Sequence, residues 1–100
     1  MEKFCIIVID WNLKGDSGHE VLAVTTTDKA KKCLKHFVEQ EKSETYLKEF
    51  FNTDGTLKEG VLDTLDEFID TDTSFIFATK DYEYYTELLI IEKPIWDEKE

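Results

Sequence analysis

The fold is decided first by a short apolar run near the start of the chain, Phe4-Cys5-Ile6-Ile7-Val8-Ile9. Its residues are apolar at every position and mostly β-branched, which predicts a central strand that is buried on both faces. The stretch 10–18 that follows contains Asn, Gly, Asp and Ser and predicts a loop. Residues 21–26 (VLAVTT) are again typical of a strand, so the two runs predict a hairpin with a long loop.

The middle of the chain predicts three helices. The first should begin at Asp28 with Thr27 as its N-cap. Its apolar residues recur at helical spacing and form one stripe, made of Ala30, Cys33, Leu34, Phe37 and Val38. A short second helix is expected after Ser43. The capping-box pattern Thr56-Leu57-Lys58-Glu59 opens a third, which should end near Asp70. The apolar residues of this third helix would fall within a stripe about 140° wide; they are Leu57, Val61, Leu62, Leu65, Phe68 and Ile69.

Two further strands are expected at 74–79 and 86–91, joined by residues 80–85. The order ββ–ααα–ββ lacks βαβ alternation and therefore predicts an α+β fold, an antiparallel four-stranded sheet with the helices packed on one face. A chain of 100 residues suits one core. We expect residues 1–100 to form a single domain in which 97–100 is a frayed acidic tail.

The composition limits the class of partner. The chain has 23 Asp plus Glu residues against 12 basic residues, all of them Lys, and a net charge of −11. Direct binding to nucleic acid or to an anionic membrane needs a basic surface, so both are excluded. The apolar run 4–9 is too short for the core of a signal peptide and no apolar run approaches 18 residues, so we expect a soluble cytoplasmic protein. Cys5 and Cys33 are expected to be reduced, partly buried side chains.

The negative charge is concentrated in the segment 53–72, which holds seven acids and one Lys. One interpretation is a solvated face that keeps the protein soluble. The other is imitation of a nucleic acid, since acids four apart on a helix rise by about 6 Å, which is similar to the phosphate spacing along a strand. Such a face would bind the basic surface of a protein partner, for example a nuclease. The residues concerned are Glu59, Asp63, Asp66, Glu67, Asp70 and Asp72.

Aromatic residues form a second candidate surface. Tyr82, Tyr84 and Tyr85 lie between acidic residues in the segment expected to join the last two strands. Tyrosines in such a place act as interface anchors, or they cover one end of the sheet, and both interpretations remain open here. Trp11 and Trp96 belong to the same aromatic set.

Motifs for catalysis or metal binding are incomplete. Gly15-Asp16-Ser17-Gly18 is similar to the nucleophile segment of trypsin-type proteases, but its composition is that of an ordinary turn. His19 and His36 lack zinc-ligand spacing. The segments 10–18 and 52–55 follow a calcium loop for a few positions only, which leaves weak calcium binding open. We therefore expect a protein that is not an enzyme and uses neither a cofactor nor a metal ion.

A resemblance covers residues 4–42. An apolar strand ending in Asp10-Trp11-Asn12, a Gly-containing loop, Glu20-Val21-Leu22-Ala23-Val24 and a Lys-rich amphipathic helix follow one another. This series resembles the opening of a family of short acidic proteins of low-GC Gram-positive bacteria and their mobile elements, and it implies no activity. In size and charge the chain is also similar to phage anti-defence proteins such as anti-CRISPRs.

The sequence thus predicts a non-enzymatic inhibitor that blocks a basic nucleic-acid-binding surface, with the acidic residues supplying charge and the tyrosines anchoring the contact. The alternative is a small accessory protein, or a homodimer, that associates through apolar and aromatic surface while its acidity serves solubility only.

Overall fold

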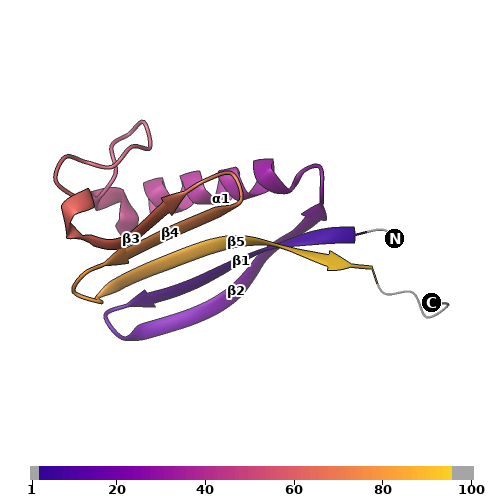
Figure 1. Ribbon diagram of the computed structural model, residues 1–100, viewed down its shortest axis with the longest axis horizontal. Coiled ribbons are helices and arrows are strands. Elements are labelled where there is room, and N and C mark those ends of the chain that lie inside the picture. Colours follow the sequence, from indigo (N-terminus) through magenta and orange to yellow (C-terminus); the bar gives the residue numbers. More distant parts are fainter. Residues whose placement is uncertain (1–2, 96–100) are drawn as a thin grey trace.

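The computed structural model describes residues 3–95 as a five-stranded antiparallel sheet of order β2-β1-β5-β4-β3, with one long helix lying across one face (Figure 1). The elements are β1 (Lys3–Leu13), β2 (Asp16–Thr26), α1 (Ala30–Glu44), the 3-10 turns η1 (Tyr46–Glu49) and η2 (Leu62–Thr64), β3 (Leu65–Asp70), β4 (Ser74–Thr79) and β5 (Tyr84–Pro94). The fold is α+β, but the predicted four-stranded sheet with three helices is wrong. Residues 97–100 and Trp96 lie outside the described residues.

The largest error concerns the predicted third helix. Residues 57–64 form an irregular segment ending in η2, in which Gly60 has a φ of 83° that a right-handed helix does not contain. Residues 65–70 are the edge strand β3, paired with β4. A bulge at Asp66 places Leu65 and Phe68 on the same face of this strand although they are three residues apart. The i, i+3 spacing that indicated a helix therefore arises from a bulged strand.

The predicted long loop between the first two strands is also wrong. β1 and β2 remain paired as far as Leu13 and Asp16, and Lys14 and Gly15 make a two-residue turn with φ values of 52° and 97°. Both central residues of a type I′ hairpin turn need such positive φ values. The polar composition of 10–18 reflects the exposure of this hairpin and not a loop.

The predicted ends of the first two helices differ from those in the structure by a few residues. α1 begins at Ala30 after Lys29, and Thr27 caps nothing, while the expected second helix is the single 3-10 turn η1, capped by Thr45. The final strand begins at Tyr84, which is earlier than predicted.

The core lies between α1 and the sheet. The helix buries the apolar stripe that the sequence predicted, including Ala30, Leu34 and Val38. The sheet contributes alternate residues of β1, β4 and β5, and Leu47 and Phe51 close one end. The residues buried in this cluster are Ile7, Ile9, Leu34, Val38, Leu47, Phe51, Leu65, Phe75, Phe77 and Leu88.

The opposite face of the sheet, here called the open face, carries no helix (Figure 1). Its residues follow from the strand registers, which give five rows across β2, β1 and β5: Thr26–Phe4–Lys93, Val24–Ile6–Ile91, Val21–Val8–Leu89, His19–Asp10–Glu87 and Ser17–Asn12–Tyr85.

Candidate functional site

Three turns meet at one end of the sheet and form a continuous surface, here called the turn end. The β1–β2 turn donates a hydrogen bond from Lys14 N to Glu83 O over 2.7 Å. The β4–β5 turn donates from Lys80 N to Thr64 O in η2 over 2.9 Å. We define the turn end by its exposed residues, which are Lys14, Asp16, Leu62, Asp63, Asp66, Lys80, Asp81, Tyr82 and Glu83.

Tyr82 is the most prominent side chain of the turn end. It is 81% exposed and has a φ of 60°, a left-handed conformation that a non-glycine residue adopts only when its surroundings hold it there. The Asp81 carboxylate supplies that constraint, because it accepts hydrogen bonds from the Thr79 hydroxyl (2.5 Å) and from Glu83 N (3.0 Å). Both hydrogen bonds also lower the pKa of Asp81, and the bond from the Thr79 hydroxyl has the larger effect. Tyr82 is therefore presented to solvent on an ordered turn.

Acidic side chains surround the apolar residues of the turn end. Leu62 is 61% exposed, Asp63 follows it within η2, and Asp66 lies at the start of β3. The two lysines there are engaged within the protein. Lys80 Nζ donates to Asp63 O over 2.9 Å, and Lys14 Nζ lies 5.8 Å from the centre of the Tyr84 ring. The turn end thus combines exposed apolar groups with an excess of carboxylates.

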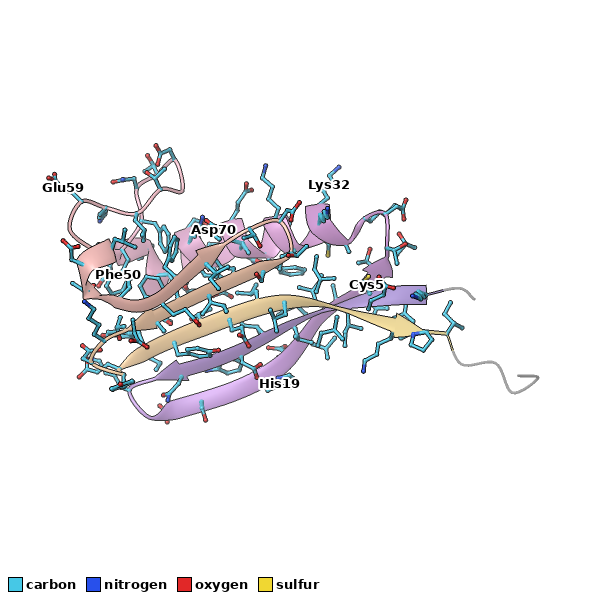
Figure 2. All side chains as sticks on the ribbon, in the orientation of Figure 1. Cys5, His19, Lys32, Phe50, Glu59 and Asp70 are labelled. Carbon is cyan, nitrogen blue, oxygen red and sulfur yellow. The ribbon has the colours of Figure 1, made fainter. Side chains whose placement is uncertain are left out.

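The acidic residues singled out in the sequence do not form one row. Asp63 and Asp66 lie at the turn end and Glu67 lies on the open face beside Ala78. Glu59 is exposed on the outer loop, whereas Asp70 lies next to α1 (Figure 2). Asp70 pairs with Lys42 and Asp72 with Lys31, so helix lysines partly balance these two charges. Their predicted arrangement along one helix face is wrong because the segment is not helical.

The three tyrosines face different ways because neighbouring residues of a strand point to opposite faces. Tyr82 is at the turn end. Tyr84 packs into the core side, stacked on Tyr46 with ring centres 5.2 Å apart, so it covers the end of the sheet. Tyr85 lies on the open face near Asp10, Glu67 and Glu87. Partial burial, followed by the charge of Glu87, raises the pKa of Tyr85 to about 12.

The sequence reasoning missed Leu62, Asp81 and Glu83. Leu62 was assigned to the buried stripe of the expected helix, and only the 3-10 turn exposes it. Asp81 has a recognisable pattern, since an Asp two residues after Thr79 and two before Glu83 is typical of a side-chain-capped turn.

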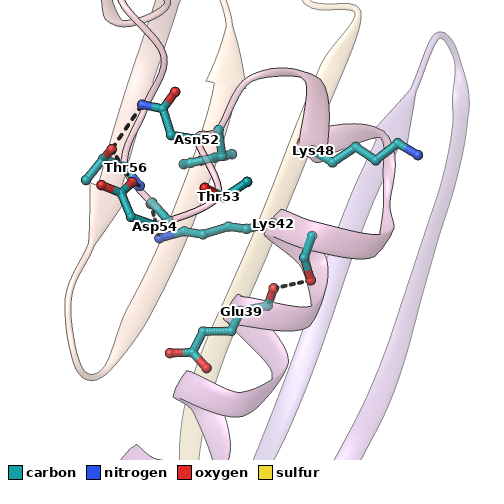
Figure 3. Close-up of a pocket in the computed structure, with 10 residues that line it drawn as sticks. Glu39, Lys42, Lys48, Asn52, Thr53, Asp54 and Thr56 are labelled. Carbon is teal, nitrogen blue, oxygen red and sulfur yellow. Dashed lines mark hydrogen bonds between the residues drawn. The ribbon is translucent and has the colours of Figure 1, made fainter.

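A cleft of about 530 Å³ lies beside α1, lined by Glu39, Lys42 and the turn 52–56 (Figure 3). Lys42 reaches across it and donates to Gly55 O over 3.0 Å, so its ammonium is used within the protein. Asp54, in the segment compared with a calcium loop, accepts from both N and Oγ1 of Thr56. In residues 3–95 no three His, Cys, Asp or Glu side chains gather in a way that suits a metal ion.

Comparisons with family models, curated proteins and solved structures find no match to this chain. The resemblance over residues 4–42 therefore stays a prediction. Within the described part of the chain, no helix has the length and apolar character needed to cross a membrane.

Proposed function

We propose that this protein is a non-enzymatic binding module that attaches its turn end to a basic surface of a partner protein. The observation that carries the proposal is the placement of two highly exposed apolar side chains, Tyr82 and Leu62, among Asp63, Asp66 and Glu83.

Tyr82 has the properties of an interface anchor. Tyrosine is enriched among the residues that contribute most to binding, because a large ring with few rotatable bonds loses little entropy when it is buried. The backbone of Tyr82 is held by the Asp81 carboxylate, so part of the ordering cost is met before the partner arrives.

The charge of the turn end selects the partner. Carboxylates around an apolar centre attract a surface rich in Lys and Arg, and the net charge of −11 increases the association rate with such a surface. Proteins that bind nucleic acids carry surfaces of this kind. Covering one would block access of the nucleic acid, which is the inhibitory function that the sequence predicts, now attributed to the turn end instead of a helix.

The test is affinity capture from a bacterial lysate at about 0.1 M and about 0.5 M salt, followed by competition between this protein and a labelled duplex for the purified partner. The test variant is Asp63→Asn/Asp66→Asn/Glu83→Gln, which removes three charges and leaves Asp81 to hold the turn. The matched control, Glu39→Gln/Glu44→Gln/Glu49→Gln, also removes three exposed charges, from α1 and η1.

We expect capture of a nucleic-acid-binding protein at the lower salt concentration, displacement of the duplex, and affinity reduced about tenfold or more in the test variant only. Equal losses in both variants would mean that net charge alone matters. Binding unchanged in the test variant would overturn the proposal.

A further inference from the structure

The open face carries two exposed apolar side chains on its edge strand, Val24 (67% exposed) and Val21 (50% exposed). Both belong to rows completed by the half-buried Ile6, Ile91 and Leu89 and by Val8, which its neighbours bury. A contiguous apolar patch on a sheet face marks an association surface. This surface is separate from the turn end.

A bulge in the sheet creates this patch. Val21 pairs with Val8, but Ala23 pairs with Ile7 and Val24 with Ile6, so Leu22 is the extra residue. Without the bulge, Val21 and Val24 would point to opposite faces, because they are three residues apart. The bulge therefore brings both valines to the open face.

Charges of opposite sign border the two apolar rows. Lys93 lies in the row beyond Ile6, and Asp10 and Glu87 lie in the row beyond Val8. Along β5 the order on the open face is Glu87, Leu89, Ile91, Lys93. This order is self-complementary. When β5 of a second copy faces it in the reverse direction, Lys93 lies over Glu87 and Ile91 lies over Leu89.

We propose that the open face binds a second copy of this chain, in a two-fold sandwich of two sheets. The two-fold axis lies in the plane of the interface and runs perpendicular to the strands. It passes between the row that contains Ile6 and the row that contains Val8. The apolar rows of the two copies then pack on each other, and Lys93 meets Glu87 of the partner subunit twice. Sheets that pack in this way lie about 10 Å apart with their strands roughly aligned.

The dimensions of the open face suit a weak dimer. The three long strands have 11 residues each. Such strands span roughly 36 Å by 14 Å, or about 500 Å², and the adjoining part of β4 adds about 100 Å². The face is smaller than the about 800 Å² per partner of standard interfaces, so we expect a weak dimer. Because the axis runs across the strands, the two turn ends lie at opposite ends of the dimer and both stay accessible.

The first test is the mass of the full chain in solution. We expect twice 11.7 kDa by sedimentation and light scattering at about 50 µM. Val24→Lys should raise the dissociation constant at least about tenfold, because it puts a charge in one of the apolar rows that pack on the second copy. The matched control is Leu62→Lys, which changes a similarly exposed apolar residue at the turn end and should leave the dimer unchanged.

The second test distinguishes this arrangement from other dimers. Lys93→Glu and Glu87→Lys should each weaken the dimer about fivefold, and the double variant should restore it, because the pair is reformed with its charges exchanged. Circular dichroism verifies the fold of each variant. A wild-type chain that is monomeric at about 500 µM would overturn the proposal, and so would a double variant no better than the single ones. Neither result bears on binding through the turn end.

Discussion

Lys42 in α1 and Asp70 at the end of β3 form an ion pair, with Nζ and Oδ2 2.6 Å apart. The lysine side chain is only 12% exposed, and its ammonium also bonds Gly55 O and lies 5.1 Å from the centre of the Phe51 ring. One side chain thus connects the helix, the turn 52–56 and the edge strand, three segments that are far apart in the sequence.

Replacing Lys42 with Met should destabilise the protein by about 1–3 kcal/mol, because it leaves the Asp70 carboxylate and Gly55 O without their partner. Urea denaturation measures the change in the free energy of unfolding. Lys35→Met is the control, since Lys35 is exposed and its contact with Glu39 is 4.0 Å long. Its effect should stay within about 0.5 kcal/mol, and equal losses in both variants would show that the Lys42 contacts contribute little.

Gly18→Ala should destabilise the β1–β2 hairpin, because a Cβ at Gly18 would lie 2.1 Å from a ring carbon of Trp11. The ring must move out of the core side of the sheet, at a cost of about 1–3 kcal/mol. Thermal unfolding measures the loss. In a Trp11→Leu background the same substitution should cost much less, and an equal cost there would show that the contact does not limit residue 18.

Alkaline pH should destabilise the protein partly through Tyr85. Its pKa rises from 10.0 to about 12 on folding, so the folded state keeps the phenol proton that the unfolded state loses. The resulting contribution to stability is fully present below pH 10 and is lost as the pH rises toward 12. Unfolding free energies measured at several pH values above 9 should therefore fall less steeply in Tyr85→Phe than in the wild type. Parallel slopes in the two proteins would contradict this assignment.

The Asp81 carboxyl should titrate below its ordinary value, because the Thr79 hydroxyl and Glu83 N bond its charged form. Since folding lowers this pKa, the associated stability is present above the unfolded value and is lost as the pH falls through the folded one. Carboxyl NMR titration measures the pKa directly. Thr79→Val should move it upward, while Thr71→Val, which changes a threonine in another turn, should not.

Part of this fold could be predicted from local pattern. The run Phe4–Ile9 is apolar on both faces and lies in an interior strand, and Ala30, Leu34 and Val38 are buried as their helical spacing predicted. The candidate site could be predicted less well from local pattern. Asp63, Asp66 and Tyr82 were among the residues singled out and are exposed, but their grouping depends on hydrogen bonds between turns far apart in the chain.

The amino-acid sequence by itself determined the charge, the α+β class and the strands and helix whose patterns are regular. Only the tertiary structure decided that residues 57–70 form an irregular segment followed by an edge strand, and that Val21 and Val24 lie on the same face of the sheet. The physical reason is the same in both places. A bulge, at Asp66 in β3 and at Leu22 in β2, brings residues three apart to one face of a strand. Residues three apart also share one face of a helix, so only pairing with a distant strand distinguishes a bulged strand from a helix.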